Sequence, residues 1–185
     1  MLSIFKKNST RNEKLKHISD AGSEKKTRNL QGFIQKLKET GVKGDEEYCK
    51  RLLSMLAKEM EIIQGAFYRY NEKVSPPVLQ FFAGYACNGE HTKELTFEEG
   101  EGLPGQVIKD RKTLKLENVP EGYITVKTGL GEASPDTLLL IPVMKGDKMP
   151  GLLELASFHN FSDEDMQFLE GLSEHLAEKF KNEKK

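Results

Sequence analysis

The chain has 185 residues, of which 37% are hydrophobic and 31% are charged, and its formal net charge is −1. This composition predicts a globular protein with one domain and an extension. No apolar run approaches the roughly 18 residues that a membrane-spanning helix needs, and Met1–Lys7 lacks the apolar stretch of a secretory signal. Cys49 and Cys87 show neither disulfide nor metal spacing, so we expect no disulfide framework, no metal site and a cytoplasmic location.

Charge is divided unevenly along the chain. Residues 1–44 carry a net charge of +7, whereas residues 45–185 carry −8. The basic leader suits contact with anionic lipid or nucleic acid, or a solvated segment stabilised by the acidic body. Because no aromatic residues interleave these charges, we expect no nucleic-acid partner. The leader of residues 1–44 is predicted to be partly disordered, with one short helix near 27–40 that carries Leu30, Phe33, Ile34 and Leu37.

The domain, residues 45–185, is predicted to begin with a helix from Asp45 to about Gln64. Its apolar stripe includes Cys49, whose predicted role is that of a small core residue. The hairpin turn Lys145–Lys148 joins the last two strands, and Leu138–Ile141 is apolar on both faces, which indicates a central strand. Six strands are predicted: Ala66–Tyr70, Val78–Cys87, Lys93–Phe97, Thr113–Leu116, Thr137–Val143 and Gly151–Phe158.

The closing helix has the clearest start signal. Ser162 is the expected N-cap, with Asp165 at the third helical position, and Phe161 with Met166 forms a hydrophobic staple. The apolar face of this helix consists of Leu169, Leu172, Leu176 and Phe180. The elements together predict an α+β domain, with the terminal helices on one face of an antiparallel sheet and glycine-rich loops over the other.

The motifs that could carry catalysis are weak. Gly100, Gly102 and Gly105 have the spacing of a dinucleotide-binding loop, but neighbouring glutamates and the missing βαβ context argue against that function. Leu103 and Val107 are instead expected to point inward from a strand-to-helix turn. Cys87 and His91 could approach as nucleophile and base, although a structural cysteine is the simpler interpretation. We therefore predict no enzyme activity and no cofactor.

Glu154 lies between Leu153 and Leu155 in an apolar strand, so it faces the opposite side of the sheet from both neighbours. A carboxylate in that position needs a partner. Two interpretations stay open: it orients a ligand amine or amide on the floor of a pocket, or it pairs with a loop N–H or with Lys127.

Several segments in order resemble a GAF domain, in particular the modules of bacterial sensor histidine kinases and chemoreceptor-like proteins. These segments are 79–86, 99–106, 119–124, 128–133, 138–143 and 153–158. The resemblance implies a sheet of about six strands, helices that often dimerise, and a pocket for ligands that range from cyclic nucleotides to amino acids. The Asn-Lys-Phe-Asp-Glu pattern of cyclic-nucleotide binders is absent. Also absent are the cysteines that attach bilins and those that GAF-fold methionine sulfoxide reductases place in the loops corresponding to 103–105 and 128–133.

The sequence therefore predicts a non-catalytic cytoplasmic sensory module that binds a small organic ligand and signals through helix contacts to a separate protein. The alternative is a structural or dimerisation module whose pocket is filled by its own side chains. A homodimer through the terminal helices is expected. In the structural alternative, this dimer is built from the helices at 45–64 and 162–181, with Leu172 and Leu176 at its interface. The predicted pocket residues are Phe82, Tyr85, Leu103, Val107, Tyr123, Val126, Leu130, Leu138 and Glu154.

Overall fold

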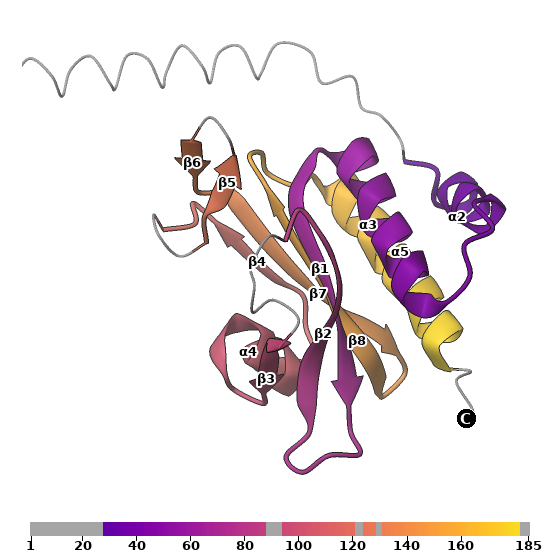
Figure 1. Cartoon of the computed structure of the whole chain (residues 1–185), viewed down its shortest axis with the longest axis vertical. Coiled ribbons are helices and arrows are strands. Elements are labelled where there is room, and N and C mark those ends of the chain that lie inside the picture. The colour runs from indigo at the N-terminus through magenta and orange to yellow at the C-terminus, as the bar shows by residue number, and fades with distance from the viewer. Residues whose placement is uncertain (1–27, 88–93, 121–123, 129–130, 182–185) are drawn as a thin grey trace, which may run out of the picture.

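The computed structural model describes residues 28–87, 94–120, 124–128 and 131–181. A curved antiparallel sheet lies between two layers: α3 and α5 cover one face, and α4 with the small β5–β6 hairpin lies on the other side (Figure 1). The helices are α2 (Leu30–Glu39), α3 (Asp45–Met60), α4 (Gly102–Asp110) and α5 (Asp163–Lys181). The strands are β1 (Ile62–Asn71), β2 (Val78–Tyr85), β3 (Thr96–Glu98), β4 (Leu114–Glu117), β5 (Val126–Thr128), β6 (Gly131–Ala133), β7 (Thr137–Lys145) and β8 (Lys148–Ser157).

The main sheet has six strands in the order β3-β2-β1-β8-β7-β4, and every pairing is antiparallel. The predicted α+β architecture is confirmed, with the terminal helices of the domain on one face of the sheet. The hairpin turn between β7 and β8 is also as predicted, because Lys145 pairs with Lys148 and Gly146 adopts the left-handed conformation that the turn requires. The β5–β6 hairpin was not predicted, since its strands have only three residues each.

Two apolar clusters fill the two sides of the sheet. One lies between the sheet and helices α2, α3 and α5, and the other lies under α4 and the loops. Strand β7 contributes to both, because Leu139 and Ile141 face the helices while Leu138 and Leu140 face the opposite side. All four are at most 2% exposed. This confirms the prediction that Leu138–Ile141 is a central strand covered on both faces.

Helix α3 ends at Met60 instead of continuing to Gln64 as predicted. Glu61 adopts a left-handed conformation with φ 53°, and β1 begins at the next residue. This single residue turns the chain from helix to strand, so Ile63 packs in the cluster under α4 and not on the helix stripe. Apolar periodicity did not detect the turn, because a helical spacing of apolar residues continues across it.

The predicted N-terminus of α5 is confirmed in detail. The Asp165 N–H donates to Ser162 Oγ at 3.2 Å, and the Ser162 N–H donates to Asp165 Oδ2 at 2.9 Å, which is the reciprocal capping arrangement. Leu172 and Leu176 are both 0% exposed. They belong to the core of the protomer, so the expectation that they form a dimer interface is wrong. The apolar stripe of α5 is used to cover the sheet.

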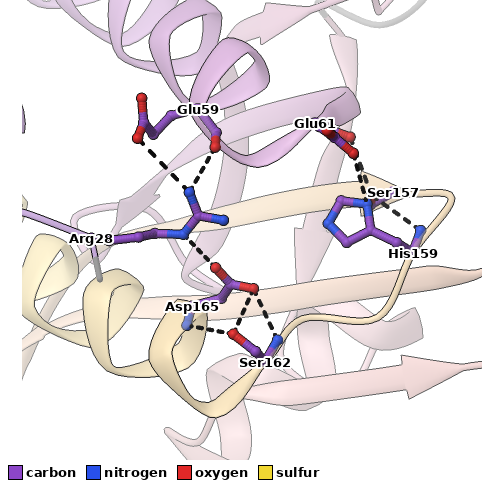
Figure 2. Close-up of polar contacts among 7 residues, drawn as sticks. All are labelled: Arg28, Glu59, Glu61, Ser157, His159, Ser162 and Asp165. Carbon is purple, nitrogen blue, oxygen red and sulfur yellow. Dashed lines mark hydrogen bonds and ion pairs between the residues drawn. The ribbon is translucent and has the colours of Figure 1, made fainter. Parts of the chain in front are cut away.

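The helix in the basic leader packs onto the domain. Phe33 of α2 meets Phe168 of α5 edge to face, with ring centroids 5.3 Å apart. Figure 2 shows Arg28, just before α2, between the end of α3 and the start of α5. Its guanidinium donates to the Asp165 carboxylate and, at 2.6 Å, to the Glu59 carbonyl oxygen. Helix α2 is thus attached to the domain by apolar and ionic contacts, whereas the prediction of disorder falls on residues 1–27, outside the described part of the chain.

Candidate ligand-binding cavity

A cavity of about 510 Å³ lies on the sheet face opposite α3 and α5. The floor of this cavity lies over β1 and β8, where the small side chains of Ala66 and Ala156 leave space above the sheet. Ala66 of β1 pairs with Glu154 of β8, and Ala156 pairs with Gln64 on one side and Leu138 on the other. The described lining residues are Gln64, Gly65, Ala66, Tyr68, Phe81, Ala86, Cys87, Leu95, Phe97, Gly102, Leu103, Pro104, Ile124, Thr125, Val126, Leu138, Glu154 and Ala156.

Aromatic rings form one wall of the cavity. The ring of Tyr68 on β1 lies edge to face with Phe81 on β2, at 5.9 Å between centroids, and with Phe97 on β3, at 5.7 Å. Such pairs add to the stabilisation that burial of the rings already provides. The wall is consequently a packed, apolar surface that spans three adjacent strands.

The start of α4 forms another wall, through Gly102, Leu103 and Pro104. This helix approaches β3 closely at Gly105, where an added Cβ would lie 2.3 Å from the Glu98 carbonyl oxygen. The glycine spacing therefore serves a tight strand-to-helix turn. That is the predicted alternative to a dinucleotide-binding loop, and Leu103 and Val107 both pack inward as expected.

Glu154 supplies the acidic group of the floor. It is only partly exposed, and burial raises the pKa of its carboxyl group, while a hydrogen bond from the Tyr68 hydroxyl acts in the opposite direction. Burial and the nearby Glu154 charge together raise the pKa of Tyr68 well above its ordinary value, so this hydroxyl remains a donor. The cavity thus contains a carboxyl group that accepts one hydrogen bond from Tyr68 and whose ionisation is disfavoured by its surroundings.

Gln64 and Cys87 lie side by side at the edge of the same floor. The Gln64 Nε2 is 3.8 Å from the Cys87 Sγ, which donates in turn to the Gly65 carbonyl oxygen at 3.3 Å. Burial raises the pKa of the Cys87 thiol, although the hydrogen bond from Gln64 opposes this shift in part. The Gln64 Oε1 is buried without a hydrogen-bond partner among the described residues.

The structure distributes the nine predicted pocket residues over several places. Leu103, Val126, Leu138 and Glu154 line the cavity. Val107 packs in the apolar cluster beside it without lining it. Tyr123 and Leu130 lie outside the described residues, as does the side chain of Lys127, the alternative partner of Glu154.

Phe82 and Tyr85 lie on the opposite face of the sheet, against the helices. The reason is a bulge in β2: Tyr68 pairs with Phe81 and Phe67 pairs with Ala83, so Phe82 is an extra residue. Its ring lies 6.3 Å from Phe67, and the Arg69 guanidinium stacks over it at 4.0 Å. Phe81 shares the cavity face with Leu79 by ordinary alternation. The bulge then places Phe82, Ala83 and Tyr85 together on the helix side.

Sequence reasoning missed Gln64, Tyr68, Phe81 and Phe97. Gln64 and Tyr68 were detectable in principle, because they alternate with Ala66 along β1 and therefore share its face. This alternation was hidden by the assignment of Gln64 to the preceding helix. Within the described residues, no three histidine, cysteine or carboxylate side chains gather as a metal site would require.

The comparisons with known proteins identify the family. A family profile described as the GAF domain matches residues 46–179, so the chain belongs to the GAF domain family. A search of curated proteins found no match. In the part of the chain that the structure describes, no helix has the length and apolar character needed to cross a membrane.

Solved structures with the same fold come from proteins of different function. The GAF domain of an Acinetobacter phosphoenolpyruvate-protein phosphotransferase has 20% identity and a TM-score of 0.67, with 82% of this chain and 90% of that one covered. The A. aeolicus nlh2 GAF domain in an inactive state has 21% identity and a TM-score of 0.62, with 84% and 97% covered. A free methionine-R-sulfoxide reductase from Neisseria meningitidis, in complex with its substrate, has 15% identity and a TM-score of 0.63, with 86% and 93% covered. The fold therefore includes both regulatory domains and reductases.

Proposed function

We propose that this GAF domain is a non-catalytic sensory module that binds a small organic molecule in the cavity beneath α4. The observation that carries the proposal is the cavity itself. Its volume of about 510 Å³ lies within the roughly 300–1,000 Å³ typical of ligand pockets, and its lining is mostly apolar with a few polar groups, as in such pockets. A module with a self-filled pocket, the alternative from the sequence, would have no space of this size.

The position of the cavity supports a role in signalling. Gln64 and Ala156 line it from β1 and β8, and these two strands connect directly to α3 and α5. Ser157 is the last residue of β8, and Glu61 lies between α3 and β1. The Ser157 hydroxyl donates to the Glu61 carbonyl oxygen at 3.2 Å (Figure 2). We propose that a ligand which shifts these strands changes the relative position of the two helices and of any protein bound to them.

The outward face of α3 carries charged residues, which argues against an apolar homodimer interface on this helix. Glu46, Glu47, Lys50, Arg51 and Lys58 lie on the exposed or half-exposed side of α3. Because cores of stable interfaces are depleted of charged residues, an apolar dimer through this face is disfavoured. Homodimerisation, a separate signalling partner, the cytoplasmic location and the division at residue 45 remain predictions from the sequence.

Reduction of methionine sulfoxide is the second candidate, because Cys87 lines the cavity and reductases share the fold. The thiolate is the reactive form of cysteine, whereas burial raises the pKa of Cys87 and favours the thiol. The other cysteine, Cys49, is 0% exposed on the helix side of the sheet, with its pKa raised by burial to about 12. Neither cysteine therefore has the environment of a nucleophile, which supports a binding function.

A thermal-shift screen of metabolites tests the proposal. A ligand present at about 100 times its Kd stabilises the protein by roughly 2.7 kcal/mol, which corresponds to a rise in Tm of about 5–10 °C for a domain of this size. Ala156→Leu fills part of the floor and should abolish the shift, whereas Ala133→Leu, at an exposed position of β6, should retain it. Failure of every compound to raise the Tm, or equal shifts in both variants, would contradict ligand binding at this cavity.

A further inference from the structure

The described lining residues of the cavity have an unbalanced set of charges. Glu154 is the sole acidic residue among its described lining residues, and these include no lysine, arginine or histidine. Tyr68 and Cys87 have their pKa values raised by burial and stay neutral. Among the described lining residues, an anionic ligand would therefore meet a carboxyl group without a compensating cation.

The described residues satisfy the acceptors of the floor only in part. An ionised carboxylate has about four acceptor positions, and Glu154 receives a side-chain hydrogen bond from Tyr68. Its strand partners on either side are Ala66 and Leu140, whose side chains have no donors. The Gln64 Oε1 is a second acceptor without a partner among the described residues, and Gln64 lines the same cavity. The floor thus presents hydrogen-bond acceptors to an apolar space.

We propose that the ligand is a small organic cation, a protonated amine on an apolar body. Its ammonium group donates to Glu154, and its body packs against the aromatic wall of Tyr68, Phe81 and Phe97. This inference rests on the proposed function, because it specifies the ligand of the same cavity. An ammonium ion supplies both a positive charge and two or three donors, neither of which the described residues provide beyond the Tyr68 hydroxyl and the Gln64 amide. A neutral alcohol has one donor and no charge, and a carboxylate has no donor and a negative charge.

Matched compounds separate these three possibilities. For a phenylethyl skeleton the probes are 2-phenylethylamine, 2-phenylethanol and 3-phenylpropionate. For a branched aliphatic skeleton they are 3-methylbutylamine, 3-methylbutanol and 4-methylpentanoate. Binding to the full chain at pH 7.5 is measured by protein-observed NMR titration. We expect the better amine to bind at least tenfold more tightly than its alcohol, and the carboxylates to bind more weakly than either.

Glu154→Gln tests the contact itself. The glutamine amide oxygen can still accept from the Tyr68 hydroxyl, so the fold is expected to persist. Loss of the charge should weaken amine binding by on the order of 10- to 100-fold, the range for hydrogen bonds to charged groups, with little change for the alcohol. Glu174→Gln, on the exposed side of α5, removes the same charge elsewhere and should leave both affinities unchanged. Tyr68→Phe retains the carboxylate and should retain amine binding.

The possible failures are distinguishable. If the alcohol or carboxylate binds as tightly as the amine, or if Glu154→Gln has no effect, the cationic ligand is refuted. Ligand binding at the cavity then stands if Ala156→Leu abolishes the interaction. If none of the six probes binds at 10 mM, the cationic ligand is also refuted. Ligand binding by the cavity is then tested by the thermal-shift screen of metabolites alone.

Discussion

The contact of Arg28 with Asp165 gives the sharpest prediction of stability. The two side chains are only 14% and 9% exposed. Arg28→Ala removes the guanidinium from a carboxylate that keeps its two donors from Ser162. Hydrogen bonds to charged groups contribute about 1.5–3 kcal/mol. We therefore expect a loss of about 2 kcal/mol in the free energy of unfolding at pH 7, below the 3–5 kcal/mol typical of a fully buried pair.

The pH dependence of this loss of stability shows whether it comes from the ion pair between Arg28 and Asp165. Burial alone would raise the pKa of Asp165, but hydrogen bonds from the Ser162 backbone and from Arg28 lower it overall. The stability that this group contributes is therefore present above the pKa of an unfolded aspartate, about 3.9, and is lost as pH falls through the lower folded value. Urea denaturation at pH 7 and at successively lower pH should show a difference between wild type and variant that shrinks below about pH 4.

The matched control is Arg51→Ala, which removes an arginine from the exposed side of α3. Surface substitutions of this kind usually change stability by less than about 0.5 kcal/mol. If Arg28→Ala behaved like this control, or if its effect were the same at pH 7 and pH 3, the ion pair would not be what fastens the leader to the domain.

Two further predictions concern buried positions. Leu172→Lys places a charge in the core between α5 and the sheet, so far-UV circular dichroism should show loss of the folded state, and a folded monomer would contradict the packing seen here. Glu154→Gln should make the unliganded protein more stable at pH 7. Because burial raises the folded pKa of Glu154, its ionisation destabilises the fold increasingly as pH rises above the unfolded value, about 4.3. Denaturant titrations should show this advantage vanish below about pH 4, and wild type more stable at pH 7 would contradict it.

The elements predicted best from the sequence are those whose signals are local. The Ser162–Asp165 cap depends on residues three apart, and the apolar run Leu138–Ile141 is itself evidence of coverage on both faces. Each of these two signals is contained in four consecutive residues. Sequence reasoning therefore located the central strand and the closing helix with no knowledge of what packs against them.

The candidate site was predicted only in part, because its residues depend on two irregularities of the backbone. The left-handed Glu61 sets where β1 begins, and the bulge at Phe82 sets which face Phe82 and Tyr85 occupy. Neither irregularity has a glycine or proline to mark it in the sequence. A one-residue change in register moves a side chain to the other face of a sheet. Errors at these two points therefore removed Gln64 from the predicted pocket and placed Tyr85 in it.

The position of Glu154 connects stability with ligand choice. In the centre of β8, between Ala66 and Leu140, an ionised carboxylate is poorly compensated when the cavity contains no cation. A ligand that brings a positive charge then gains twice, from its own contact and from relief of the unfavourable burial of Glu154. A ligand without charge gains only from apolar contact. The unfavourable burial of the Glu154 charge therefore predicts two effects of Glu154→Gln: the empty domain becomes more stable, and its amine complex becomes weaker. If only one effect were observed, the role of Glu154 in the fold would be separate from its role in binding.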